Sequence, residues 1–290
     1  MLTRVLVGLV GIPLVVCIIG LGGWFFAGAV IVITTIALIE FYRLAASKHA
    51  EANISVGIIW SLCIQTSVAL MCSARGFDGL TWLLASAAYL VGGLLLTMTA
   101  ELWRNRENAL LNTAITAFGV MYVTVCMTAL IILRGVEKQT YESITWFADH
   151  GAYLVLTIFI SVWVCDTVAY FVGIRFGKHK LFPRVSPKKS WEGAAGGFVG
   201  AIAAFVILGS YFLPQMPILH AVVCGVIVAV MGQVGDLAES LLKRDASVKD
   251  SSQIIPGHGG LLDRFDSILF VAPLILIYVQ IISHNGWMQW

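Results

Sequence analysis

The chain has 290 residues, of which 59% are hydrophobic and 12% are charged, and its mean hydropathy is +0.90. Soluble domains carry about 25% charged residues, so this composition excludes an ordinary soluble globule. The net charge is only +2, and the distribution of the charges is more informative than their sum. The apolar runs are long and continuous, without the alternation of barrel strands, which favours membrane helices.

Nine apolar windows follow one another along the chain, and most have the length of about 20 residues that spans a bilayer. They cover residues 5–22, 24–44, 54–73, 80–102, 110–133, 152–174, 193–213, 218–237 and 267–284. We interpret the first window as an uncleaved helix, because it has no obvious small-residue cleavage site and leads straight into the second. The sequence therefore predicts an all-α polytopic membrane protein with about nine transmembrane helices.

The basic residues are distributed unevenly when nine spans are threaded through a bilayer. All of them except Arg75, Arg134 and Lys138 fall on one side. Because Lys and Arg are enriched in cytoplasmic loops, we expect a cytoplasmic N-terminus and a C-terminus on the outer, periplasmic side. The expected organisation is a single integral membrane domain, with about five spans in residues 1–150 and about four in residues 151–290. Two cytoplasmic loops of the second part, 175–192 and 238–266, hold most of the polar chemistry.

The loop at 175–192 and the span before it contain candidate binding residues. Ser186, Lys188 and Lys189 could capture a phosphate group by charge and hydrogen bonding. A solvated basic loop would have the same composition, and both interpretations stay open. Asp166 lies inside the sixth span, where an acidic residue is a functional candidate by default. Its alternative is a buried residue with a local hydrogen bond.

The end of the eighth window carries a regular polar pattern. If that helix continues past the membrane, Asp236, Glu239, Ser240 and Lys243 lie on one face, near the inner edge of the bilayer. A carboxylate there is costly unless it pairs with a cation or binds one. A solvated helix end with incidental ion pairs is the alternative interpretation.

A glycine-rich turn leads into the last helix. Gly257, Gly259 and Gly260 surround His258, and the ninth helix is expected to begin near Leu261. Exposed amides before a helix N-terminus suit an anion, although a simple re-entry turn also needs glycines. His258 could donate a hydrogen bond to phosphate or have only a structural role in the turn. The charged residues of the same loop are Lys243, Arg244, Lys249, Asp250, Asp263, Arg264 and Asp266. Such a mixture of carboxylates and cations suits Mg²⁺ with a polyphosphate.

These motifs resemble the phosphatidate cytidylyltransferase (CDP-diacylglycerol synthase) family. That family's pattern S-x-hydrophobic-K-R-x4-K-D, a spacer and H-G-G-x-x-D-R-x-D is filled by Ser240, Lys243, Arg244, Lys249, Asp250, His258, Gly259, Gly260, Asp263, Arg264 and Asp266. Upstream, the segments around Asp166, Ser186–Lys189 and Asp236 also agree with it. The motifs cover about residues 160–267, and the N-terminal spans agree only in hydrophobic pattern.

The resemblance implies a nucleotidyltransferase of phospholipid biosynthesis in a bacterial inner membrane. It would convert CTP and phosphatidate to CDP-diacylglycerol and pyrophosphate, with Mg²⁺ and room for a second cation. The site would face the cytoplasm, where CTP is found. Because the attacking phosphate oxygen is already ionised near neutral pH, the main tasks are positioning and charge neutralisation.

On this hypothesis the candidate residues take three roles. The metal ligands are Asp236 and Asp263, with Asp166 and Asp250 as second choices or outer-shell partners. The catalytic set is Asp236, Asp263, Lys249, Asp250 and Arg264. The substrate-binding set is Ser186, Lys188, Lys189, Ser240, Lys243, Arg244, His258, Gly259 and Gly260.

Two other functions stay open from the residues alone. A CTP-dependent lipid kinase acting on a polyprenol-type alcohol would use similar acids and cations. A transporter with acidic residues at its inner face belongs to another class, and it predicts polar residues spread over several spans. The expected partners are CTP, phosphatidate and membrane lipid. Nucleic acid is not expected, because the basic loops lack interleaved aromatic residues. A homodimer is one candidate oligomeric state.

Overall fold

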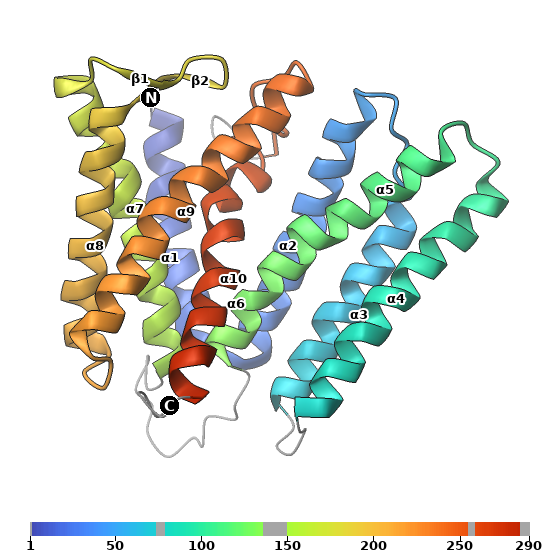
Figure 1. Cartoon of the computed structure of the whole chain (residues 1–290), viewed down its shortest axis with the longest axis horizontal. Helices are drawn as coiled ribbons and strands as arrows, with labels where there is room; N and C mark the ends of the chain where they lie inside the picture. Colours follow the sequence, from blue (N-terminus) through green and yellow to red (C-terminus); the bar gives the residue numbers. More distant parts are fainter. Residues whose placement is uncertain (1, 74–78, 136–149, 255–258, 285–290) are drawn as a thin grey trace. The chain divides into compact units, whose positions relative to one another are not determined.

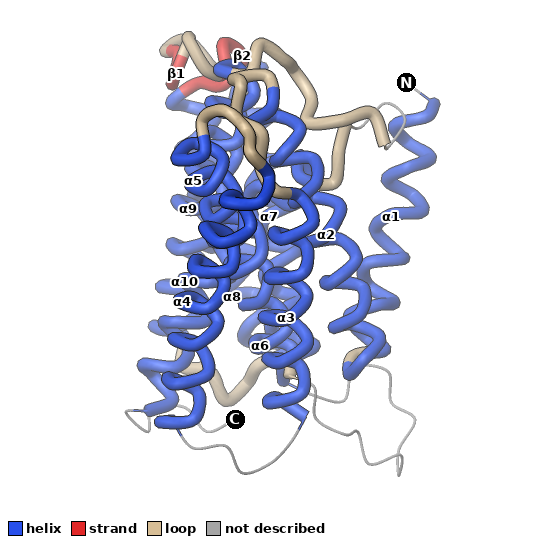
Figure 2. Tube along the Cα trace, turned by 90° about the vertical axis from the view of Figure 1, so that its right-hand side faces the viewer, coloured by secondary structure: helices blue, strands red, loops and turns tan. Residues whose placement is uncertain are grey.

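The computed structural model describes residues 2–73, 79–135, 150–254 and 259–284, which are almost entirely helical (Figures 1 and 2). The helices are α1 (Leu2–Leu21), α2 (Gly23–Ala46), α3 (Ile54–Ser73), α4 (Gly79–Arg104), α5 (Ala109–Gly119), the π-helical segment η1 (Val120–Val125), α6 (Cys126–Arg134), α7 (His150–Phe176), α8 (Trp191–Phe212), α9 (Ile218–Asp245) and α10 (Leu262–His284). Within these described ranges, eight helices are long and apolar enough to cross a membrane, with Ala109–Arg134 counted as one. A shorter apolar stretch, Gly8–Leu21, lies in α1. The prediction of an all-α polytopic membrane protein is confirmed.

The helix ends differ from the apolar windows where the helices carry charge. α9 continues to Asp245, beyond the end of its apolar window at residue 237, and α10 already begins at Leu262. The connection between them is therefore residues 246–261, shorter than the loop expected over 238–266. Hydropathy does not detect these extra helical turns of α9 and α10. A helix that leaves the membrane core keeps its backbone hydrogen bonds but no longer needs apolar side chains. Arg75 and Lys138 lie outside the described residues, and the orientation of the termini stays a prediction.

The loop expected over 175–192, between α7 and α8, contains a short hairpin. Strands β1 (Lys180–Phe182) and β2 (Ser186–Ser190) pair antiparallel, with Lys180 opposite Ser190 and Phe182 opposite Ser186. The red segments of Figure 2 show this hairpin. The pairing gives the basic segment a fixed backbone, so its lysines project from defined positions.

The chain divides into two compact units. The first consists of residues 1–144 and 246–264, and the second of residues 145–245 and 265–290. The connection between α9 and α10 therefore belongs to the same unit as the N-terminal helices, although it follows them by more than a hundred residues in the sequence.

The first unit is built on α2 and α3 with the α5–α6 span. Phe41 and Tyr42 of α2 contact each other, and Phe41 also contacts Phe118 and Tyr122. The buried hydroxyl of Tyr42 donates to the carbonyl oxygen of Thr116 at 2.8 Å. This aromatic cluster fixes the end of α2 that also carries Glu40.

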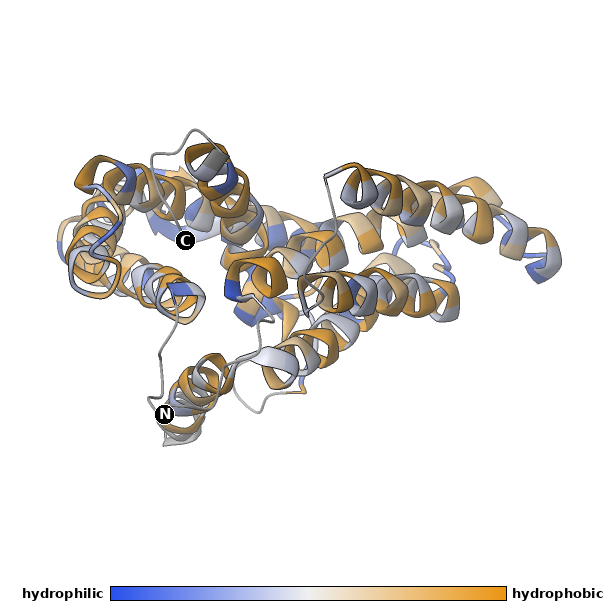
Figure 3. Ribbon diagram, turned by 90° about the horizontal axis from the view of Figure 1, so that it is seen from below, coloured by the Kyte–Doolittle hydropathy of each residue, from blue (hydrophilic) through white to orange (hydrophobic). Residues whose placement is uncertain are grey.

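In the second unit α7, α8 and α9 lie side by side, and the hairpin connects α7 to α8 (Figure 1). Small residues allow the close approach of α7 and α8. A Cβ atom at Gly193 would lie 2.7 Å from the carbonyl oxygen of Ala169, and one at Gly197 would lie 2.9 Å from that of Cys165. Glycines spaced four apart are typical of helices that pack closely within membranes. Figure 3 shows that hydrophobic residues predominate along the helices of the chain.

Candidate functional site

Acidic and basic side chains meet where α9 and α10 of the second unit come together, and we call them the acid–lysine cluster: Asp166, Lys189, Asp236, Lys243 and Asp266. The Nζ atom of Lys189 lies 2.7 Å from Oδ2 of Asp236, with both side chains about one-third exposed. The charges of Asp236, Asp166 and Lys243 act electrostatically on the half-buried carboxyl group of Asp266. The cluster thus joins side chains from α7, α9, α10 and the hairpin.

The approach of α9 to α10 depends on a glycine beside Asp236. A Cβ atom at Gly235 would lie 2.6 Å from the carbonyl oxygen of Asp266, closer than real Cβ atoms come. One turn earlier, the hydroxyl of Ser267 donates to the carbonyl oxygen of Gly232 at 3.0 Å. The two backbones are therefore in direct contact at this level, and Asp236 is brought next to Asp266.

The start of α8 holds the hairpin that supplies Lys189. The side chain of Ser190 caps α8 by accepting a hydrogen bond from the backbone N–H of Gly193 at 3.2 Å. The carboxylate of Glu192 accepts from the backbone N–H of His179 and lies 2.6 Å from Nδ1 of its ring. Lys189 directly precedes this capped turn, so its backbone is fixed on both sides.

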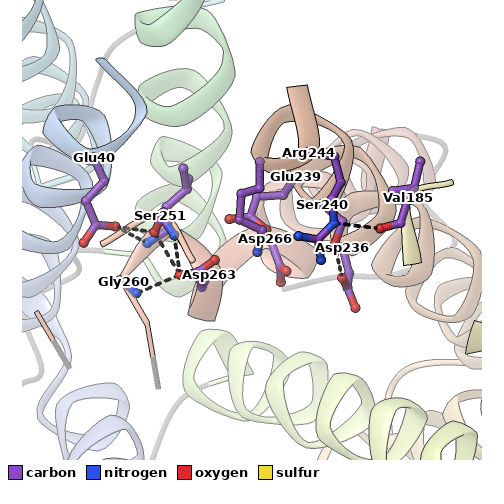
Figure 4. Close-up of polar contacts among 12 residues, drawn as sticks. Glu40, Val185, Asp236, Glu239, Ser240, Arg244, Ser251, Gly260, Asp263 and Asp266 are labelled. Atoms are coloured by element: carbon purple, nitrogen blue, oxygen red, sulfur yellow. Dashed lines mark hydrogen bonds and ion pairs between the residues drawn. The ribbon is translucent and has the colours of Figure 1, made fainter. Parts of the chain in front are cut away.

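The face of α9 predicted from the spacing of its polar residues is present. The hydroxyl of Ser240 donates to Oδ1 of Asp236 at 3.3 Å, one helical turn away (Figure 4). Lys243 forms an ion pair with Glu239, whose side chain is fully buried. The Ser240 hydroxyl therefore supports the carboxylate of Asp236 from within its own helix.

The end of α9 also contacts the hairpin. The Nε atom of Arg244 donates to the carbonyl oxygen of Val185 at 3.3 Å (Figure 4). Ser186 follows as the first residue of β2, and the side chain of Lys188 is exposed. The hairpin therefore lies beside the charged end of α9.

Asp263 organises the connection that belongs to the first unit. Its Oδ2 atom accepts from the backbone N–H of Ser251 at 2.9 Å and from the hydroxyl of the same residue at 2.9 Å. It also accepts from the backbone N–H of Gly260 at 2.7 Å (Figure 4). Asp263 is 9% exposed, so this carboxylate ties the two ends of the connection together in a largely buried position.

Glu40 of α2 is a second buried acid in this region, and the sequence interpretation did not include it. Its carboxylate is fully buried and accepts from the backbone N–H groups of Leu261 at 3.1 Å and Leu262 at 2.8 Å. The hydroxyls of Ser251, at 3.2 Å, and Ser252, at 2.5 Å, also donate to it. The argument that selected Asp166, an acid within an apolar span, would have found Glu40 too. Glu40, Ser251, Ser252, Gly260 and Asp263 are called the α10-start network below.

The structure gives a steric reason for the presence of glycine at two positions of the predicted phosphate-binding turn. Gly259 has a φ of +80°, and a Cβ atom there would overlap Oδ2 of Asp263. A Cβ atom at Gly260 would overlap the Ser251 hydroxyl and the Glu40 carboxylate. These positions therefore require glycine because two carboxylates lie against the backbone. His258 lies outside the described residues.

The predicted site residues divide between the two units. The second unit holds Asp166, Ser186, Lys188, Lys189, Asp236, Ser240, Lys243 and Arg244, and the first holds Lys249, Asp250, Gly259, Gly260, Asp263 and Arg264. In the second set, Lys189 and Asp236 are in contact in the acid–lysine cluster, and Asp166 and Lys243 act on it electrostatically. In the first set, Gly260 and Asp263 meet in the α10-start network, and the side chains of Lys249, Asp250 and Arg264 are exposed.

The acid–lysine cluster fits a hard divalent cation that is shared with phosphate. In the described parts of the chain, no three His, Cys, Asp or Glu side chains form a ready-made metal-ligand group. Mg²⁺ needs no such group, because it is held through one or two carboxylates, with waters and substrate phosphates completing its coordination. Asp236 and Asp266 supply carboxylate oxygens, and Lys189 supplies positive charge for a phosphate group.

The chain matches the family model described as "Cytidylyltransferase family" over residues 2–282. Similar proteins include the phosphatidate cytidylyltransferase of Haemophilus influenzae, which is 43% identical over 150 residues, or 50% of this chain and 52% of the relative. That of Bacillus subtilis is 37% identical over 163 residues, 56% of each chain. These matches span only about half the length of either relative. The phosphatidate cytidylyltransferase of Synechocystis is 28% identical over 297 aligned residues, covering 96% of both chains. With a family model that spans nearly its whole length, the chain belongs to the cytidylyltransferase family.

Proposed function

We propose that the chain transfers the cytidylyl group of CTP to phosphatidate, yielding CDP-diacylglycerol and pyrophosphate. The observation that carries the proposal is the acid–lysine cluster, a group of charges from the hairpin and from three helices that are otherwise apolar. Membership of the cytidylyltransferase family supports it, as do the relatives named phosphatidate cytidylyltransferase. Phosphatidate keeps its acyl chains in the bilayer and its phosphate at the interface, where such a cluster can meet it.

In the proposed reaction an oxygen of the phosphatidate phosphate attacks the α-phosphorus of CTP. The bond from that phosphorus to the bridging oxygen of the β-phosphate breaks, and pyrophosphate leaves with the electron pair. Because the attacking oxygen carries its negative charge before the reaction, the side chains need to position and neutralise rather than remove a proton. Lys189 and Lys243 supply positive charge, and Asp236 orients Lys189 through their ion pair.

Mg²⁺ is the proposed cofactor, held by Asp236 and Asp266, with Asp166 as a further carboxylate nearby. When bound, it would neutralise phosphate charge at the α-phosphorus and the leaving group. Asp263 was the other ligand expected from the sequence, and it stays a candidate. Its contacts in the α10-start network support an orienting role for one of its oxygens.

The deciding experiment uses the purified chain, phosphatidate, Mg²⁺ and CTP labelled at the α-phosphorus. Label in the lipid with release of pyrophosphate is the expected result. The lipid kinase predicts label that leaves as CDP when a polyprenol replaces phosphatidate. A transporter predicts no turnover with either lipid, and each of these outcomes contradicts the proposal.

The proposed location is the bacterial inner membrane with the site on the cytoplasmic face. The membrane-length helices and the bacterial relatives support an integral membrane protein of bacterial type. A cysteine introduced at exposed Lys188 should react with an impermeant maleimide only after the inner membrane of spheroplasts is opened. Labelling of intact spheroplasts would contradict this orientation. Assembly as a homodimer stays a prediction, to be tested by the mass of the purified protein in detergent.

A further inference from the structure

We propose that Glu40 is a positioning residue, which holds the segment between α9 and α10 in the conformation that the reaction needs. Its catalytic consequence rests on the proposed function. Its structural part, the attachment of residues 246–264 to α2, can be tested independently. Glu40 lies in a transmembrane helix far from the motifs of the C-terminal half, and nothing in the sequence links it to them.

The four hydrogen bonds to Glu40 divide evenly between its two oxygens. Oε1 accepts from the hydroxyl of Ser252 and the backbone N–H of Leu261. Oε2 accepts from the hydroxyl of Ser251 and the backbone N–H of Leu262. The backbone N–H groups at a helix start have no partner within the helix, and a negative charge there is favoured by the helix dipole. Glu40 thus anchors the start of α10 as well as the connection before it.

The anchor reaches Asp263 through a shared hydroxyl. The Oγ atom of Ser251 lies 3.2 Å from Oε2 of Glu40 and 2.9 Å from Oδ2 of Asp263. The hydroxyl carries one proton and donates to one carboxylate at a time, so the two acids compete for it. Both acids also hold the backbone around Gly260: Asp263 accepts from its N–H, and Glu40 accepts from the next two residues. Loss of Glu40 leaves the hydroxyl to Asp263, but it frees the backbone beside Gly260 and should thereby displace Asp263.

A carboxylate suits this position better than an amide. In Glu40→Gln one of the two acceptor oxygens becomes an NH₂ group, which faces the backbone N–H of Leu261 or Leu262 in either orientation. A serine hydroxyl can rotate to accept from the amide, but a backbone N–H group cannot. Gln therefore keeps half of the anchor, and Ala removes all of it. This ordering separates an anchor from a residue that only fills space.

The first arm of the test measures hydrogen exchange of the full chain in detergent. In Glu40→Ala, amides in a peptide covering residues 259–264 should exchange about tenfold faster or more, since each hydrogen bond to a charged group contributes about 1.5–3 kcal/mol. Glu40→Gln should lie between Ala and wild type. The control is Glu101→Gln, which alters another buried acid of the same unit that pairs with Arg104. Wild-type exchange at 259–264 in Glu40→Ala would overturn the proposal, and Glu40→Gln decides it if the alanine variant does not fold.

The second arm measures kcat, KM for CTP and the Mg²⁺ concentration that gives half-maximal rate. Glu40→Ala should lower kcat by roughly 10²-fold, as small displacements of catalytic groups do. The Mg²⁺ requirement should rise where the displaced Asp263 is the further Mg²⁺ ligand, and Glu40→Gln should recover part of both. Glu101→Gln should leave them unchanged. A wild-type kcat with accelerated exchange would refute the catalytic role of the anchor. If the wild-type chain itself does not turn over CTP, the proposed function fails and the exchange arm still decides the anchor.

Discussion

The contact of α9 with α10 at Gly235 allows a direct test of how the acid–lysine cluster is assembled. The perturbation is Gly235→Ala, a single methyl group next to Asp236. The new Cβ atom would lie 2.6 Å from the carbonyl oxygen of Asp266. That oxygen belongs to backbone, so the clash cannot be relieved by turning a side chain.

The size of the effect follows from this distance. Carbon–oxygen contacts are comfortable from about 3.3 Å, so the two helices must separate by about 0.7 Å. Overpacking of this kind costs about 1–3 kcal/mol, and the better helix propensity of Ala returns about 0.5–1 kcal/mol. A shift approaching 1 Å between catalytic groups lowers rates by up to about 10²-fold. We therefore expect kcat for Gly235→Ala to fall by about tenfold or more, with a modest loss of thermal stability.

The matched control is Gly232→Ala, one turn earlier on the same face of α9. Its Cβ atom would meet the nearest atoms, in Ser267 and Val271, at 3.8 Å, an ordinary van der Waals contact. The assay follows cytidylyl transfer to phosphatidate in mixed micelles, with the melting temperature measured in parallel. Gly232→Ala should keep wild-type kcat and melt no earlier than wild type. Equal activities of the two variants would refute the claim that the contact at Gly235 positions Asp236.

Three further predictions concern charge and metal. Lys189→Ala removes the partner of Asp236 and should lower kcat by about 10²-fold, a loss typical of a missing charge-stabilising donor. The control is Lys180→Ala, which alters an exposed lysine of the same hairpin and should keep the wild-type kcat. Equal losses in the two variants would attribute the effect to the net charge of the hairpin and contradict the role of Lys189. Asp263→Asn weakens an acceptor of three hydrogen bonds and should abolish Mg²⁺-dependent turnover in a chain that still folds in detergent. The control is Glu107→Gln, which alters an exposed acid. Wild-type activity in Asp263→Asn would remove this residue from the site. Removal of divalent cations by EDTA should stop turnover, and Mg²⁺ should restore it in proportion to its free concentration; turnover that persists in EDTA would contradict the cofactor assignment.

The transmembrane architecture could be predicted because it depends on composition and length. A helix satisfies its own backbone hydrogen bonds, so about 20 apolar residues suffice to predict a span without knowledge of its neighbours. The polar face of α9 could be predicted for a similar reason. Asp236, Ser240 and Lys243 are related by helical periodicity, which is local, and the contacts of Asp236 with Ser240 and of Lys243 with Glu239 follow from it.

The assembly of the candidate site was decided by contacts between residues far apart in the chain. Glu40 meets Leu262 across 222 positions, and an acid in an apolar window does not indicate which backbone amides it will cap. From the sequence the glycines suited either an anion site or a simple re-entry turn. The structure adds a steric reason for Gly259 and Gly260, the carboxylates of Asp263 and Glu40.

By itself the sequence determined that the chain is a helical membrane protein and which residues are candidates for its chemistry, since both depend on local composition and spacing. The tertiary structure decided that Gly235 lies against the backbone of Asp266 and that Asp236 pairs with Lys189. It also decided that the segment before α10 is held by a helix near the N-terminus. Those pairings depend on how closely two backbones can approach and on which donors a buried carboxylate must find, and neither is encoded in local spacing.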